Sequence, residues 1–145
     1  MPEAEHTVTI ARSTEDVFDF LADGTNNPRW RPAVLEIHAT GDTAGVGASY
    51  RQVMRGPGGR KIAGDYRVTT YDRPTTLGFE VTAGPARPVG TFQIAPTGSG
   101  STSVTFRLSA APTGIMRLAS RMIVKQMRAE TRNLDNLKVQ LEKPV

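Results

Sequence analysis

Two polar side chains lie on an otherwise apolar face of an expected C-terminal helix. Gln126 and Glu130 are four residues apart, which places them on the same side as Ala119, Met122 and Leu137. A carboxyl group that faces an apolar cavity is costly unless it is paired or protonated, and desolvation raises its pKa, as a general acid or base requires. Glu130 is therefore a candidate acid/base residue. The alternative is that it lies at a rim or pairs with an inward Arg or Tyr.

Two tyrosines and one histidine add further candidates. Tyr50 and Tyr66 are in phase with apolar neighbours on expected strands, so either hydroxyl could face a ligand or be satisfied within the core. Tyr66 is the second candidate for proton transfer. His38 shares a strand face with Glu36, a pairing that could tune an imidazole or simply face solvent.

The absence of other reactive groups removes support for most nucleophilic, phosphoryl-transfer and redox classes of enzyme. The chain has no Cys and two His, and it has no Gly-x-Ser-x-Gly motif, phosphate loop or dinucleotide fingerprint. The run Gly56-Pro57-Gly58-Gly59 lacks the Lys-Ser/Thr that a phosphate loop needs. His6 lies near the N-terminus, where we expect fraying, so a metal site is not expected. We predict neither a metal nor a cofactor.

The elements that must position these residues begin with a strand and a helix. Residues 5–11 read as a strand, and Ser13 then offers an N-cap for a helix over 14–22 with acidic residues in its first turn. Val17, Phe18 and Leu21 share one helix face, and a short helical turn near 26–30 leads to the only tryptophan, Trp30.

The middle of the chain alternates between strands and Gly/Pro turns. Side chains alternate between apolar and polar, as in Ile62, Tyr66 and Val68 against Lys61, Asp65 and Arg67. This pattern is typical of an antiparallel sheet with one face covered by a helix. The further strands are expected near 33–40, 48–55, 60–71, 75–83, 88–96 and 101–109.

A long helix is expected over 114–141. Its apolar face consists of Ile115, Ala119, Met122, Ile123, Leu134, Leu137 and Leu141. The opposite side carries Arg117, Arg121, Lys125, Arg128 and Arg132, and residues 112–145 hold seven basic against three acidic side chains. The net charge of +4 therefore lies on this helix. The basic face is either solvated or meets anionic lipid or an acidic partner. Nucleic acid is the least well supported partner and is not expected, because no stacking surface of aromatic and basic residues is apparent.

Length and composition fit one domain. The 145 residues can enclose a core and a pocket, and we predict one domain over 1–145. The first residues are polar and acidic, without the apolar stretch of a signal peptide or a membrane span. A soluble, cytoplasmic protein is expected, with homodimerisation as an open question.

The chain resembles the START-type helix-grip superfamily (SRPBCC), which includes polyketide cyclase/dehydrase-like proteins and pollen-allergen-like lipid binders. The resemblance covers nearly the whole chain and rests on the element order and on Val17-Phe18-Asp19-Phe20-Leu21, Pro28-x-Trp30-x-Pro32, Gly45-x-Gly47, Tyr71-x-x-Pro74 and the final helix. It implies an α+β fold in which a curved antiparallel sheet of about six or seven strands wraps a long C-terminal helix. Two short helices follow the first strand, and an apolar cavity lies between sheet and helix.

The resemblance also implies that the loops at 56–59 and 84–88 lie near the cavity mouth, although plain hairpin turns explain their Gly and Pro equally well. The first functional hypothesis is binding of a small hydrophobic or aromatic molecule. The second is an aromatase/cyclase or dehydratase-type enzyme that uses Glu130 or a cavity Tyr such as Tyr66, and the third is an interaction module that uses the basic helix face. The expected ligand-binding residues are Trp30, Tyr50, Met54, Tyr66, Phe79, Phe92, Phe106, Met122, Gln126 and Glu130.

Overall fold

The computed structural model describes residues 2–41, 45–84, 86–111 and 114–144. The strands are β1 (Glu3–Ile10), β2 (Val34–Ala39), β3 (Ser49–Arg55), β4 (Lys61–Ala63), β5 (Tyr66–Asp72), β6 (Thr76–Val81), β7 (Val89–Pro96) and β8 (Thr102–Ser109). The α-helices are α1 (Thr14–Ala22), α2 (Ser120–Arg132) and α3 (Leu134–Glu142). Short 3-10 helices are η1 (Gly24–Arg29), η2 (Pro57–Gly59) and η3 (Gly114–Ala119).

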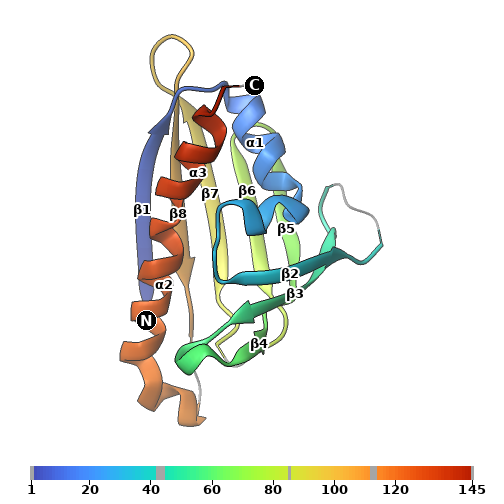
Figure 1. Ribbon diagram of the computed structural model, residues 1–145, viewed down its shortest axis with the longest axis vertical. Coiled ribbons are helices and arrows are strands. Elements are labelled where there is room, and N and C mark those ends of the chain that lie inside the picture. Colours follow the sequence, from blue (N-terminus) through green and yellow to red (C-terminus); the bar gives the residue numbers. More distant parts are fainter. Residues whose placement is uncertain (1, 42–44, 85, 112–113, 145) are drawn as a thin grey trace.

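One antiparallel sheet and a C-terminal helix make up the fold (Figure 1). Over the described ranges the strands follow the order β1-β8-β7-β6-β5-β3-β2, and β4 pairs with β3 beside this path. The terminal helix, α2 followed by α3, lies along the β1 and β8 side of the curled sheet. This arrangement confirms the predicted helix-grip fold, including the two short helices after the first strand.

The expected strand over 60–71 is divided into β4 and β5. At the division the backbone N–H of Gly64 donates to the carbonyl of Gln52 at 2.7 Å, and Asp65 accepts from the Gln52 N–H at 3.1 Å. A Cβ atom at Gly64 would lie 2.6 Å from the sulfur of Met54. The ladder is interrupted because Gly64 approaches β3 closely and the Asp65 carboxylate bonds to the β3 backbone. The short strand β4 therefore pairs with β3 beside the main path of seven strands.

The expectation of a frayed N-terminus is wrong for the described residues. β1 begins at Glu3 and pairs with β8 in a register that places His6 opposite Phe106. The His6 ring nitrogen Nε2 also lies 2.9 Å from Asp135 Oδ1 on α3. Both the ladder and the terminal helix therefore hold this strand, because its backbone groups are paired with β8 and its core-facing side meets α3.

The first helix follows its sequence signals closely. The Ser13 hydroxyl accepts the Asp16 N–H at 3.1 Å, which caps the helix, and Val17, Phe18 and Leu21 are all buried. A side-chain cap satisfies one of the N–H groups that a helix start leaves unpaired. The predicted cap and apolar face are thus confirmed.

The apolar stripe of the terminal helix is rotated relative to the expected face. The buried residues are Ile123, Met127, Thr131, Leu134, Leu137 and Leu141. Met122 is 52% exposed and Leu118 is 90% exposed, so the prediction that Met122 faces the interior is wrong. The side chain of Ile115 lies outside the described part. The stripe follows Ile123 and Met127, because these residues are in phase with Leu134 and Leu137 along the helix.

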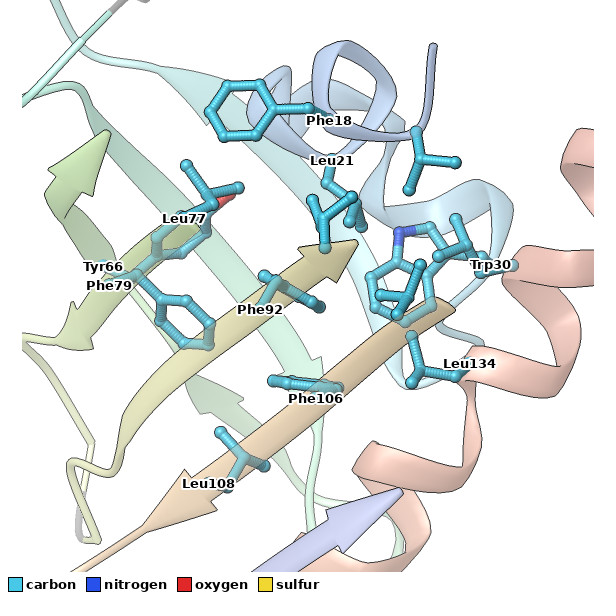
Figure 2. Packing of buried hydrophobic residues seen from close by; sticks show 14 of the residues in the cluster. Phe18, Leu21, Trp30, Tyr66, Leu77, Phe79, Phe92, Phe106, Leu108 and Leu134 are labelled. Carbon is cyan, nitrogen blue, oxygen red and sulfur yellow. The ribbon is translucent and has the colours of Figure 1, made fainter. Parts of the chain in front are cut away.

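Aromatic side chains pack together between the sheet and the terminal helix (Figure 2). The rings of Phe92 and Phe106 stack with centroids 4.3 Å apart, and Trp30 meets both edge-on at 6.1 Å. Leu134 of the terminal helix is fully buried beside Trp30. Offset and edge-on contacts of this kind add to the burial of the rings themselves. Within the described ranges, no helix combines the length and the apolar character that crossing a bilayer demands.

Candidate functional site: a cavity between sheet and terminal helix

A cavity of about 400 Å³ lies under the terminal helix, inside the curl of the sheet. Its walls are largely apolar and come from β3 to β8, from α1, from α2 and from the segment around Trp30. Five lining residues are exposed: Pro32 between η1 and β2, Arg55 on β3, Ala63 on β4, Arg87 before β7 and Ala129 on α2. The cavity therefore opens between the β3–β4 hairpin, the segment before β7 and α2.

The two Gly/Pro loops, at 56–59 and 84–88, were expected near the cavity mouth. Ala86, Arg87 and Pro88 line the cavity, whereas Pro85 lies outside the described residues. The loop at 56–59 follows directly after the lining residue Arg55 and forms η2. Both loops thus lie beside the mouth, as the resemblance implied.

A buried polar cluster forms the inner wall. Asn27, Gln52 and Tyr66 all line the cavity, and each is less than one-tenth exposed. The Asn27 amide nitrogen lies 3.0 Å from Gln52 Oε1 and 2.9 Å from the Tyr66 hydroxyl. Gln52 Nε2 in turn donates to the carbonyl of Gly64 at 3.3 Å. The cluster joins η1 to β3 and β5, so it fixes the end of the cavity that lies away from the terminal helix.

Gly24 permits the close packing around this cluster. A Cβ atom at Gly24 would lie 2.2 Å from the Tyr66 hydroxyl and 2.9 Å from the Tyr50 ring. Any side chain at Gly24 would therefore displace Tyr66. The Tyr66 ring is held between Tyr50, stacked at 5.0 Å, and Phe79, edge-on at 5.5 Å. Burial raises the pKa of Tyr66, and the Arg31 charge and the Asn27 hydrogen bond offset this only in part, so the hydroxyl keeps its proton at neutral pH.

An ion pair lies on the cavity wall near α2. Arg31 Nε donates to Glu130 Oε2 at 2.8 Å, and the two side chains are 11% and 16% exposed. Glu130 therefore has the inward Arg partner that the sequence left as one alternative. The pair also links the segment after η1 to the terminal helix, because its two members are 99 residues apart in the chain.

Trp30 forms the wall between the ion pair and the aromatic core. Its ring is 2% exposed, and its backbone carbonyl accepts from Asn136 at 3.2 Å. Within the described part of the chain, its indole Nε1 is the one fully buried side-chain nitrogen or oxygen without a hydrogen-bond partner. The Arg31 guanidinium lies 5.8 Å from the centre of the Trp30 ring. Trp30 is thus oriented by packing and by its main chain.

Comparison with known proteins identifies the family. A model of the family described as polyketide cyclase / dehydrase and lipid transport matches residues 1–142. The chain belongs to this family. Among curated proteins no match is found.

Solved structures share the fold of this family member at low identity. TTHA0849 from Thermus thermophilus is 21% identical, with a TM-score of 0.78 over 97% of both chains. A START superfamily protein from Mycobacterium smegmatis is 16% identical, with a TM-score of 0.72 over 96% of this chain and 98% of that one. The di-domain ARO/CYC BexL from the BE-7585A biosynthetic pathway is 15% identical, with a TM-score of 0.75 over 99% of this chain and 50% of that one.

The polyketide cyclase / dehydrase and lipid transport fold brings most of the expected site residues to one cavity. The wall includes Trp30, Met54, Tyr66, Phe79, Phe92, Gln126 and Glu130. Three expected residues are not on it, namely Tyr50, Phe106 and Met122. Tyr50 is buried behind Tyr66 and donates its hydroxyl to the Ala22 carbonyl at 3.3 Å, and Phe106 packs under Phe92. His38 and Glu36 are exposed partners on β2, 3.9 Å apart.

The sequence analysis missed six polar residues on the wall: Asn27, Arg31, Gln52, Arg55, Arg87 and Asn133. Gln52 lies between Tyr50 and Met54 in the same strand phase, so the alternation already placed it inward. Asn27 and Arg31 lie in and after η1, where no apolar periodicity assigns a direction. Only the packing of η1 against β2 and the sheet turns these two side chains into the cavity.

Proposed function

We propose that the protein binds a small hydrophobic or aromatic molecule, lipid-like or polyketide-like, in the cavity beneath the terminal helix. The observation that carries this proposal is the cavity itself: about 400 Å³, with mainly apolar walls and a few polar groups at one end and near α2. Such a composition is typical of ligand pockets, in which apolar walls supply affinity and a few polar groups fix orientation.

A neutral fluorescent probe, N-phenyl-1-naphthylamine, tests this proposal directly. The wild type is expected to bind the probe with one site, seen as an enhanced and blue-shifted probe emission. Ala129→Phe places a ring at the cavity mouth and should weaken binding at least about tenfold, because the added ring occupies the space of the ligand. The matched control is Arg128→Phe, one residue away, exposed and not on the cavity wall.

Equal affinity in the two variants would place the probe elsewhere and contradict the proposal. Native mass spectrometry of gently purified protein complements the titration. A defined adduct that is absent from Ala129→Phe but present in Arg128→Phe would support the cavity as the binding site and supply the class of ligand.

A second candidate function is a cyclase/dehydratase-type reaction on a molecule held in the same cavity. The observation that favours it is the position of Tyr66 and Glu130, both on the cavity wall. Under this alternative, Glu130→Gln abolishes turnover of a poly-carbonyl substrate. Under pure binding, the same variant changes affinity for an apolar ligand only a few-fold, so paired turnover and binding measurements separate the two.

A third candidate function is attachment of the terminal helix to an anionic lipid surface. The observation that favours it is the exposure of Leu118 and Met122 among Arg117, Arg121 and Lys125. Apolar side chains in a basic surface are typical of helices that lie on anionic membranes. Sedimentation with phosphatidylserine vesicles should then fall with added salt and be lost when Arg121, Lys125 and Arg128 are all replaced by Gln. Binding that persists in the triple variant would contradict this role.

A further inference from the structure

The polar cluster on the inner cavity wall has a fixed direction of hydrogen bonding. The carbonyl of Gly64 can only accept, so Gln52 presents its amide nitrogen to it, at 3.3 Å. This leaves Gln52 Oε1, which can only accept, facing Asn27. Asn27 must therefore present its own amide nitrogen, at 3.0 Å. A backbone carbonyl thus sets the orientation of both side-chain amides.

The direction of the cluster determines the role of the Tyr66 hydroxyl. The same Asn27 nitrogen lies 2.9 Å from the Tyr66 oxygen, so the hydroxyl accepts this hydrogen bond. Its own hydrogen consequently needs another acceptor, and none is bonded to it among the residues that the structure describes. The Tyr50 and Phe79 rings hold the Tyr66 ring in place. The hydroxyl is therefore an oriented donor in the wall of a cavity.

We propose that Tyr66 is the specificity-determining hydrogen-bond donor of the cavity, and that the bound molecule carries a carbonyl oxygen at this point. This inference rests on the proposed binding function and names the ligand class. An unpaired buried donor costs free energy, which a ligand carbonyl recovers and a hydrocarbon group of the same shape does not. Because the hydroxyl stays protonated at neutral pH, it donates to such an oxygen without any ionisation.

Two nearly isosteric probes measure the contribution of the hydrogen bond that Tyr66 donates. We would determine the Kd of 2-acetylnaphthalene and of 2-isopropenylnaphthalene by isothermal titration calorimetry, and define the ketone preference as the ratio of the two. Tyr66→Phe keeps the ring and should lower the ketone preference about three- to tenfold, the worth of one neutral hydrogen bond. The affinity for the hydrocarbon should stay the same and serves as the check that the cavity is intact.

Two further variants make the comparison specific. Tyr50→Phe removes a buried hydroxyl that donates to Ala22 and does not line the cavity, and it should leave the ketone preference unchanged. Asn27→Asp places a carboxylate oxygen where the amide nitrogen was, so Tyr66 donates to it and the preference should fall although Tyr66 is intact. In addition, the carbonyl 13C resonance of bound 2-acetylnaphthalene should move upfield in Tyr66→Phe.

The outcomes distinguish this inference from the proposed function. An unchanged ketone preference in Tyr66→Phe, or an equal fall in Tyr50→Phe, overturns the role of Tyr66 while both probes still bind. Failure of both probes to bind the wild type overturns the proposed function, and the inference with it.

Discussion

At the scale of single residues, the Arg31–Glu130 pair combines two charges that are mostly shielded from water. Each charge is tolerated because the other is within 2.8 Å. The sequence placed Glu130 inward by helical phase but could not identify its partner, because Arg31 is distant in the chain and lies outside any periodic element. The side chain of such a turn residue is oriented only when the turn packs against the rest of the fold.

Removing one member of this pair should lower the free energy of unfolding more than removing both. Glu130→Gln leaves Arg31 without its counter-charge and should lower the free energy of unfolding by about 1–3 kcal/mol. The double change Arg31→Met and Glu130→Met should cost less, because no buried charge remains. Urea unfolding of the three proteins measures both values. A loss in the double variant at least as large as that of Glu130→Gln would contradict this prediction.

An exposed pair provides the contrast. Arg73 and Asp19 also form an ion pair, at 2.7 Å, but both side chains are about half exposed. Asp19→Asn should therefore change the free energy of unfolding by less than about 1 kcal/mol, since solvent screens this pair. A loss as large as that of Glu130→Gln would indicate that burial is not the deciding factor.

At the scale of elements, local signals predicted α1 completely and β5 only in part. Ser13 and the spacing of Val17, Phe18 and Leu21 contain all that the helix needs, so its cap and buried face were predictable. The division at Gly64 was not, because it depends on how closely Gly64 approaches Met54 on another strand. The same limit applies to Asn27 and Arg31 in the site.

The cap of α1 gives an element-scale prediction. Ser13→Ala removes the acceptor for the Asp16 N–H and should lower the free energy of unfolding by about 1 kcal/mol. Ser13→Thr retains a hydroxyl and serves as the matched control. Equal losses in the two variants, measured by thermal unfolding, would mean that the hydroxyl does not act as a cap.

A glycine in β7 gives a second prediction at this scale. Gly90 lies opposite Phe79 in the β6–β7 ladder, and a Cβ atom there would lie 2.2 Å from the Phe79 ring. Gly90→Ala should push this ring into the cavity, lower the free energy of unfolding by about 1–3 kcal/mol and weaken binding of N-phenyl-1-naphthylamine.

The matched control for this substitution is Gly78→Ala on β6. A Cβ atom at Gly78 would meet Thr70 at 3.1 Å, and Gly78 is adjacent to Phe79 in the strand, so its added methyl group points away from the cavity. Probe affinity should stay the same in this variant. If Gly78→Ala weakens binding as much as Gly90→Ala, the effect does not come from Phe79.

At the scale of the whole molecule, the end of β1 and the turn after it meet the last turns of α3. The N–H of Ala11 donates to Glu142 at 2.8 Å, Arg12 donates to the Leu141 carbonyl at 2.8 Å, and Lys138 bonds the Thr9 carbonyl at 2.5 Å. These contacts fasten the terminal helix, which covers the cavity, to the first strand and its following turn.

The lowered pKa values of Glu142 and Asp19 predict that the fold is less stable in acid. Hydrogen bonds from Lys138 and then from the Ala11 N–H lower the pKa of Glu142, and the Arg73 guanidinium lowers the pKa of Asp19. A carboxyl whose pKa is lower in the folded state stabilises the fold above its ordinary pKa, and this stabilisation is lost as pH falls through the lowered value. The thermal midpoint should therefore fall between about pH 5 and pH 3.

Glu142→Gln and Asp19→Asn together should flatten this dependence. The measurement is a series of thermal unfolding curves at constant ionic strength, with Glu36→Gln as the control, since Glu36 is an exposed residue on β2 whose ion-pair partner is the exposed His38, at 3.9 Å. An unaltered slope in the double variant would assign the acid sensitivity to other carboxyl groups.

The single tryptophan of the chain lies in the cavity wall, shielded from water and in edge-on contact with Phe92 and Phe106. All indole emission therefore comes from one known place, without competing signals from the surface. Fluorescence excited at the red edge of the protein absorption spectrum therefore reports on the wall of the cavity alone. A molecule that enters it changes the surroundings of that one ring, so the protein carries its own optical sensor of occupancy and needs no attached dye.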